Sequence, residues 1–155
     1  MHVRDCVEAK AAESEGKDFL LYNVAEAYWR AGQGIQGLKA FADAQALSNK
    51  VGFHPNERLL LKANLLLLLK DPASLTEAER LLRSAIQIES SCEAKWFELQ
   101  STTALARLLR DTGRTGEACA MLAEIYDWFT EGFDTADLKD AKSLLDELTS
   151  LRRQE

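Results

Sequence analysis

The sequence predicts an all-α protein, built as a solenoid of tandem antiparallel helical hairpins with a C-terminal capping helix. Three observations lead to this prediction. Alanine and leucine dominate the 155 residues, proline occurs only twice, and the scarcity of valine and isoleucine disfavours sheets. Breaker residues divide the chain into segments of helical length. These segments then repeat one another along the chain.

Within the segments, apolar residues recur at spacings of three and four, which is the period of a helix with one buried face. The stripe formed by Ala78, Leu81, Leu82 and Ala85 is one example. The loops between segments are short, so neighbouring helices are expected to be antiparallel. Helices are predicted over residues 3–14, 18–31, 34–50, 56–70, 75–89, 93–112, 115–130 and 135–152.

The start of the helix at 75–89 is predicted from its capping residues. Ser74 with Glu77, and Thr76 with Glu79, both match the capping box, in which the first side chain accepts a hydrogen bond from a free backbone N–H group. Both candidates come directly before the apolar stripe, so the helix is expected to begin close to them.

Three segments share one pattern. A first helix ends at a turn marked by Gly32, Asp71 or Gly113, and a second helix then carries a small residue in its first turn and a large one four positions later. The members are Leu21, Val24, Ala25, Tyr28, Gly37, Phe41 and Ala44; then Leu60, Ala63, Asn64, Leu67, Ala78, Leu82 and Ala85; then Thr102, Leu105, Ala106, Leu109, Ala118, Leu122 and Ile125.

This spacing resembles the tetratricopeptide repeat (TPR), in which small residues let two antiparallel helices approach closely. The turns lie 39 and 42 residues apart, whereas about 34 residues is usual for the family, so the repeats are TPR-like and degenerate. A single repeat domain over 1–155 is expected. Its repeats are predicted at about 18–51, 56–90 and 93–130, with the capping helix at about 135–152. The alternative is an irregular helical bundle.

A second resemblance is carried by Leu105–Arg114, Ala118–Leu122, Trp128–Leu138 and Ala141–Leu148. These stretches are similar to the C-terminal TPR region of large bacterial signalling ATPases, many of which carry an adenylate/guanylate cyclase-type or DNA-binding domain. The resemblance implies a regulatory tail that works beside an ATPase or cyclase domain. The chain has no Gly-x-x-x-x-Gly-Lys-Ser/Thr loop to hold a nucleotide phosphate.

Composition excludes several classes of function. The formal net charge of −6 gives no counterion-release advantage on nucleic acid, so no nucleic-acid partner is predicted. The apolar run Leu59–Leu69 is too short to cross a membrane. The odd number of cysteines, Cys6, Cys92 and Cys119, indicates reduced thiols in a cytoplasmic protein.

No catalytic or metal-binding constellation is apparent, and the sequence predicts neither an enzyme nor a cofactor. His2 and His54, the two histidines, are far apart, and with the scattered cysteines they give no zinc-ligand spacing. The cluster of Asp134, Asp137 and Asp140 is explained by the positive end of a helix dipole.

Aromatic residues are interpreted chiefly as core, because they supply much of the buried area in a helical repeat. They are Trp29, Trp96, Trp128, Phe97 and Phe129. The Trp128–Phe129 pair is expected to pack the last helix onto the third repeat, and a binding surface is the alternative interpretation.

A peptide groove is predicted along the first helix of each hairpin, as the TPR resemblance implies. Its arginines would suit an extended or helical peptide of acidic character. The alternative is that these arginines are simply solvated. The groove positions are Phe19, Tyr22, Glu26, Trp29, Arg30, Arg58, Leu61, Gln100, Thr103, Arg107 and Arg110.

The sequence is compatible with three functions. The first is a protein-interaction scaffold, the regulatory TPR module of a bacterial signalling ATPase or cyclase-type regulator. The second is self-assembly into a homodimer, because the helix at 3–14 looks like the second half of a hairpin and would leave an apolar end. The third is a nucleotide-binding ATPase or cyclase component, which the missing phosphate loop disfavours.

Overall fold

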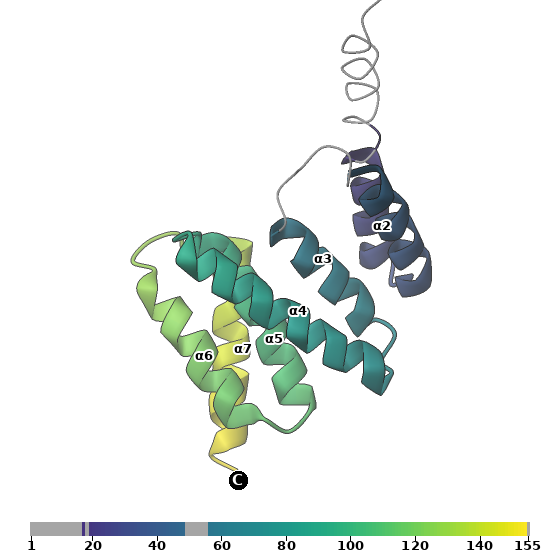
Figure 1. The fold of residues 1–155 in the computed structure, drawn as a ribbon. Helices are drawn as coiled ribbons and strands as arrows, with labels where there is room; N and C mark the ends of the chain where they lie inside the picture. Colours follow the sequence, from purple (N-terminus) through teal and green to yellow (C-terminus); the bar gives the residue numbers. More distant parts are fainter. Residues whose placement is uncertain (1–16, 18, 49–55, 155) are drawn as a thin grey trace, which may run out of the picture. The chain divides into compact units, whose positions relative to one another are not determined.

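The computed structural model describes residues 17, 19–48 and 56–154, and every regular element in these ranges is an α-helix. The all-α prediction is therefore confirmed (Figure 1). The chain divides into two compact units, Met1–Ser74 (unit 1) and Leu75–Glu155 (unit 2). The predicted boundaries of a single repeat domain stay a prediction.

Unit 1 contains a helix over residues 19–30, followed by α2 (Gly34–Ser48) and α3 (Asn56–Leu67). These match the predicted helices 18–31, 34–50 and 56–70 to within three residues at each end. The predicted helix at 3–14 lies outside the described residues. The core of unit 1 is a cluster of Ala25, Ala40, Phe41 and Leu65, with Tyr22, Tyr28, Trp29, Leu38 and Leu61 packed around it.

The first hairpin depends on close backbone packing, as the repeat pattern predicted. The first helix ends at Gly32, whose φ of +72° suits a glycine, and the N–H of Gln33 bonds back to the carbonyl of Tyr28 at 2.8 Å. A Cβ atom on Gly37 would lie 2.2 Å from the Leu65 side chain and 3.2 Å from Cβ of Tyr28. A larger residue at Gly37 would force the end of the Leu65 side chain to move and would press against Tyr28.

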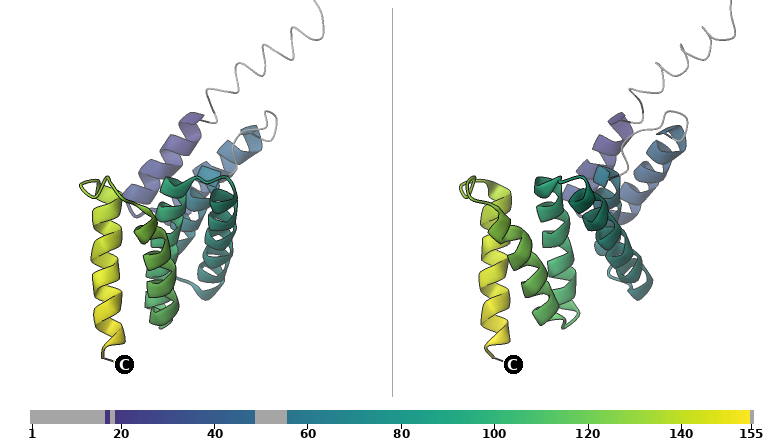
Figure 2. Two further views of the ribbon diagram at one scale, coloured as in Figure 1. Left: turned by 90° about the vertical axis from the view of Figure 1, so that its left-hand side faces the viewer. Right: turned by 60° about the vertical axis from the view of Figure 1, so that its left-hand side comes forward.

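Unit 2 is a set of helices in which α6 runs antiparallel to α5 and α7, as Figures 1 and 2 show. Fully buried leucines from three helices form its core, among them Leu105 of α5, Leu122 of α6 and Leu148 of α7. The exposed face of α7 is polar, as expected for a capping helix. The helices are α4 (Pro72–Ser91), which begins in the last residues of unit 1, α5 (Lys95–Asp111), α6 (Thr115–Trp128) and α7 (Ala136–Arg152).

The start of α4 corrects the capping prediction. The helix begins at Pro72, so Ser74 and Thr76 lie inside it and do not cap it. The cap is Asp71, whose carboxylate accepts a hydrogen bond from the backbone N–H of Ser74 at 3.0 Å. Hydrogen bonding to the Ser74 side chain, and then to the Ser74 backbone, lowers the pKa of Asp71 below its usual value. The missed signal was Asp-Pro, a capping acid followed by the residue that best suits the first helical position.

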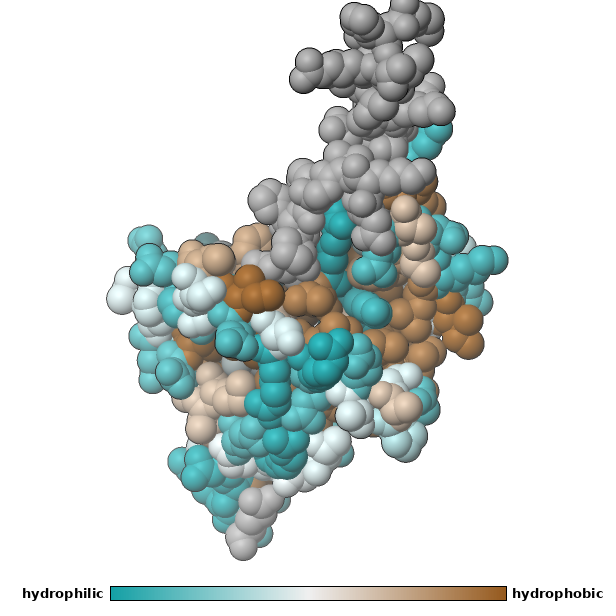
Figure 3. Space-filling view, viewed as in Figure 1, coloured by the Kyte–Doolittle hydropathy of each residue, from teal (hydrophilic) through white to brown (hydrophobic). Residues whose placement is uncertain are grey.

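In the described ranges, no helix is long and apolar enough to cross a membrane. Figure 3 shows apolar side chains gathered over the helices of unit 1, whereas the lower end of unit 2 is mainly hydrophilic. On the face shown, the surface of unit 1 is thus more apolar than the lower end of unit 2.

Candidate interaction surfaces

The predicted groove residues of unit 1 lie around an aromatic pair. Tyr22 packs edge-on against Phe41 with ring centroids 5.3 Å apart, and the guanidinium of Arg58 lies 4.5 Å above the Tyr22 ring. The Tyr22 hydroxyl is buried and has no hydrogen-bond partner among the described residues. The structure therefore brings Tyr22 and Arg58 together through a cation–π contact.

The other groove candidates of unit 1 have separate roles. Glu26 and Arg30 form an ion pair on the surface of the first helix, with 2.7 Å between Oε1 and Nη2. Trp29 and Leu61 pack against the core cluster, and Phe19 is exposed. This part of the predicted groove is a mixture of surface and core positions.

Three of the four groove candidates of unit 2 contact α7. Gln100 donates a hydrogen bond to Asp137 at 3.0 Å. Arg107 binds both carboxylate oxygens of Asp140 at 2.5 Å. One turn farther along α5, Arg110 donates to Glu147 at 3.0 Å. Three donors on one face of α5 thus contact three acceptors on one face of α7.

Arg110 and Thr103 each make a further hydrogen bond along α5. Arg110 also donates to Asp111, which is the largest cause of the raised pKa of Arg110. Thr103 is buried, and its hydroxyl donates to the carbonyl of Leu99 at 2.7 Å. Because Thr103 is turned into its own helix, it is not placed to touch a peptide.

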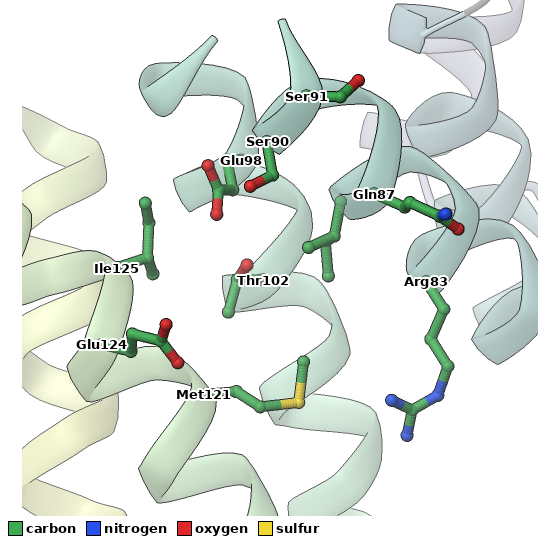
Figure 4. Close-up of a pocket in the computed structure, with 10 residues that line it drawn as sticks. Arg83, Gln87, Ser90, Ser91, Glu98, Thr102, Met121, Glu124 and Ile125 are labelled. Atoms are coloured by element: carbon green, nitrogen blue, oxygen red, sulfur yellow. The ribbon is translucent and has the colours of Figure 1, made fainter. Parts of the chain in front are cut away.

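A hollow of about 540 Å³ lies between α4, α5 and α6 (Figure 4). Ile86, Met121 and Ile125 supply its apolar lining. Its charged groups are largely engaged, since Glu98 accepts a bond from Lys95 at 2.8 Å. The hollow therefore has an apolar lining, with a few polar groups at its border. The rest of its lining is Arg83, Gln87, Ser90, Ser91, Thr102 and Glu124.

One side of the hollow is held by a network of charges between α4 and α6. Arg83 bonds to Glu79 and Glu117, each at 2.7 Å, and Arg114 bonds to the same two carboxylates. The hydrogen bond from Arg83 is the largest cause of the lowered pKa of Glu117. This arrangement ties the second helices of two successive hairpins together, and it was not predicted because its members are about 35 residues apart.

Glu89 of α4 is a buried carboxylate that was not predicted from the sequence. Its Oε1 accepts a hydrogen bond from Ser101 at 3.1 Å, while its Oε2 has no partner among the described residues. Burial is the largest cause of its raised pKa, and nearby Glu98 adds to it. Its place in the apolar stripe of α4, after Ala78, Leu82 and Ala85, was the available signal.

The aromatic residues of unit 2 correct the core interpretation. Trp128 is 58% exposed and Phe97 is also exposed, so neither is a core residue. Phe129 instead packs edge-on against Trp96, with centroids 5.9 Å apart, and Trp128 packs against Phe129 at 5.2 Å. Tyr126 and Phe133 form a further pair at 5.8 Å. The core interpretation was therefore wrong for Trp128 and Phe97, and the packing of the last helix by the Trp128–Phe129 pair stays a prediction.

The remaining candidates for chemistry are few. His2, His54 and Cys6 lie outside the described residues. Cys92 is exposed and Cys119 is buried, and both are free thiols. No group of three metal-ligating side chains occurs in the part of the chain that the structure describes.

Comparison with known proteins gives a fold but no family. No family model matches the sequence, and no curated protein matches it. A solved structure does match, that of nearly identical TPR-like repeats of a protein from Podosopora anserina described as a kinesin light chain. The two share 18% identity, over 86% of this chain and 74% of the other, with a TM-score of 0.57. The likeness shows that this chain has a TPR-like fold of tandem helical hairpins.

Proposed function

We propose that the protein is an interaction scaffold that binds acidic, helical segments of a protein partner through the α5 face formed by Gln100, Arg107 and Arg110. The TPR-like fold supports a scaffold, since repeats of this kind present long surfaces to other chains. The charge of the α5 face supports an acidic ligand, because guanidinium groups bind carboxylates in a planar, two-point geometry.

One observation carries this proposal. The α5 face already binds an acidic helix, α7 of the same chain, through Asp137, Asp140 and Glu147. The Arg107–Asp140 and Arg110–Glu147 pairs are partly exposed to solvent. Exposed ion pairs contribute little net free energy. The carboxylates of a partner with the same acidic spacing can therefore replace those of Asp140 and Glu147 at the two arginines.

The test uses the full chain and a labelled peptide with the sequence of residues 136–152. Fluorescence anisotropy would measure binding of this peptide to the protein. Asp140→Asn with Glu147→Gln is expected to tighten binding about tenfold, because the resident carboxylates no longer compete for the arginines. Arg107→Ala with Arg110→Ala should weaken it by a similar factor.

A matched control is Arg80→Ala with Arg152→Ala, which removes two exposed arginines from elsewhere in the chain. It should bind the peptide as the wild type does. Equal binding by the Arg107/Arg110 variant, or no binding by either the wild type or the Asp140/Glu147 variant, would show that the α5 face is not the site.

The biological setting that we propose is the regulatory tail of a bacterial signalling ATPase or cyclase-type regulator. The resemblance over Leu105–Arg114 and Trp128–Leu138 supports it. In that setting the partner is a neighbouring ATPase or cyclase domain, and this chain does not bind nucleotide itself. ATP should leave its melting temperature unchanged, because a ligand that binds the folded state would raise it.

Self-assembly is the second candidate, and the first helix of unit 1 favours it. Leu20 and Val24 are exposed on this helix, and Val24 lines an apolar hollow of about 290 Å³ together with Ala27 and Ala31. Exposed apolar surface of this kind is typical of contacts between proteins. Light scattering over a wide concentration range would detect a dimer as a mass near twice 17.3 kDa.

Val24→Asp should return such a dimer to the monomer, because a buried, unpaired carboxylate disfavours the contact. Phe97→Asp, at an exposed position of unit 2, is the control and should leave the mass unchanged. A constant mass near 17.3 kDa for the wild type would remove this candidate and leave the α5 face as the site to examine.

A further inference from the structure

We propose a second interaction surface, at the end of unit 2 where α5 begins and α6 ends, which binds an arginine-bearing basic segment of a protein partner. The surface is an aromatic patch, defined as two groups of contacting rings from the same segments: Trp96, Phe129 and Trp128, and the pair Tyr126 and Phe133. It is separate from the α5 face described above and selects the opposite charge.

The antiparallel course of α5 and α6 creates the patch. It places the first turn of α5, with Trp96, beside the last turn of α6, with Trp128 and Phe129. The rings of Trp96 and Trp128 both pack edge-on against Phe129, at 83° and 82°. A side chain held in this way is already ordered. Binding a partner to it therefore costs little of that side chain's conformational entropy.

Exposure separates Trp128 and Phe133 from the aromatic core, while the other three rings of the patch are half-buried. Trp128 is 58% exposed and Phe133 is 45% exposed, whereas Trp29 of unit 1 packs against a buried cluster. Burying a tryptophan supplies a large apolar free energy, and tryptophan and tyrosine dominate the hot spots of protein interfaces. An ordered but open group of aromatic rings is therefore a good anchor for a partner.

Charge indicates the kind of partner. Glu93, Asp127, Glu131 and Asp134 are exposed in the segments that form the patch, and none of them makes an ion pair with a described residue. The one basic side chain in those segments, Lys95, is bound to Glu98 at 2.8 Å. Lys142 of α7 also lies close enough to Tyr126 to interact with it, and this lysine is paired with Asp146. Both lysines near the patch are therefore engaged by other carboxylates, and the four acidic groups keep their charge.

An arginine satisfies both features at once. Its planar guanidinium can stack on an exposed indole and bind a carboxylate at the same time. The phosphates of a nucleic acid would be repelled by the four acidic groups. A wholly apolar partner would leave the carboxylates desolvated and unpaired, which is costly. Of the three kinds of partner, a basic peptide segment therefore fits the patch best.

Isothermal titration calorimetry of the full chain tests the proposal, with a short peptide of alternating arginine and leucine as the probe. Trp128→Ala should weaken binding by about tenfold or more, and Asp127→Asn with Glu131→Gln should weaken it severalfold. A lysine version of the peptide should bind more weakly than the arginine version, and a glutamate version should not bind.

The controls separate the patch from general attraction to an acidic protein. Asp43→Asn, compared with Asp127→Asn alone, removes an exposed carboxylate from elsewhere in the chain, and Ile35→Ala removes another exposed apolar side chain. Both controls should bind the arginine peptide as the wild type does. Circular dichroism should show unchanged helicity in Trp128→Ala, since that side chain is largely solvent-exposed.

Two results would overturn the proposal. One is an arginine peptide that does not bind the wild type at about 1 mM. The other is an equal loss of affinity in the patch variants and in the controls. The proposed function is tested separately, because Trp128→Ala should leave binding of the acidic 136–152 peptide unchanged, and Arg107→Ala with Arg110→Ala should leave binding of the arginine peptide unchanged.

Discussion

The helix over residues 19–30 and α5 follow the same repeat pattern but are buried to different extents. Leu105 of α5 is fully buried, whereas Val24, which occupies the matching position of the pattern, is 42% exposed. Within unit 2, α5 contacts both α6 and α7. Within unit 1, Leu20 and Val24 of the first helix stay open. The pattern therefore defines which face of a helix is apolar, while the neighbouring helices decide whether that face is covered.

Truncation at the matching positions should give the largest difference. Leu105→Ala is expected to lower the free energy of unfolding by about 3 kcal/mol, because it opens a cavity in a closed core. Val24→Ala should cost less than about 1 kcal/mol, since solvent already reaches that side chain. Urea denaturation followed by circular dichroism measures both. Equal losses would mean that the two helices are covered alike in solution.

Adding a methyl group at a glycine in each unit tests how closely the helices pack there. Gly37→Ala should lower the free energy of unfolding by about 1 to 2 kcal/mol, because the added Cβ would meet the Leu65 side chain at 2.2 Å. Gly116→Ala should raise it by about 0.5 kcal/mol, because that Cβ meets nothing within 4 Å and alanine favours the helix. A stabilised Gly37 variant would show that the first hairpin is loosely packed.

Glu89 provides a pH-dependent test within unit 2. Its folded-state pKa is raised, chiefly by burial, so ionised Glu89 destabilises the fold above that pKa and the effect disappears as the pH falls toward the unfolded-state value. Glu89→Gln should raise the free energy of unfolding by about 1 kcal/mol at pH 7. The gain should vanish below about pH 3.5, where the carboxyl of Glu89 is protonated in both the folded and the unfolded state. A gain that is independent of pH would exclude this cause.

The charge network between α4 and α6 should have the smallest effect. The pKa of Glu117 is lowered by its arginine partners, so its contribution is present above the unfolded-state pKa and is lost as the pH falls through the folded-state value. Because the pairs are partly exposed, Glu117→Gln should cost no more than about 0.5 kcal/mol, and less at high salt. Denaturation in low and high salt checks this, with Asp146→Asn as the single-pair control.

Much of the fold could be predicted because its signals are local. Breakers and apolar spacing located the described helices to within a few residues, and Gly32 and Gly113 mark turns where a positive φ is needed. The start of α4 was misplaced because two capping boxes competed with Asp71, and only the folded backbone shows which side chain reaches a free N–H group.

The candidate sites could be predicted only in part. The sequence placed Gln100, Arg107 and Arg110 on one face of α5, because a helix repeats every 3.6 residues. It could not indicate that Asp137, Asp140 and Glu147 would meet them. The same holds for Trp128, whose apolar character suggested the core although the structure leaves it exposed.

The sequence by itself determined the helices, their apolar faces and the small residues at which hairpins close, because each of these depends on residues within a few turns of one another. Only the tertiary structure decided which charges are paired and which aromatic rings stay open. Gln100 and Asp137 are 37 residues apart, and Arg107 and Asp140 are 33 apart. Contacts over such separations depend on how whole helices pack side by side, which no local pattern specifies.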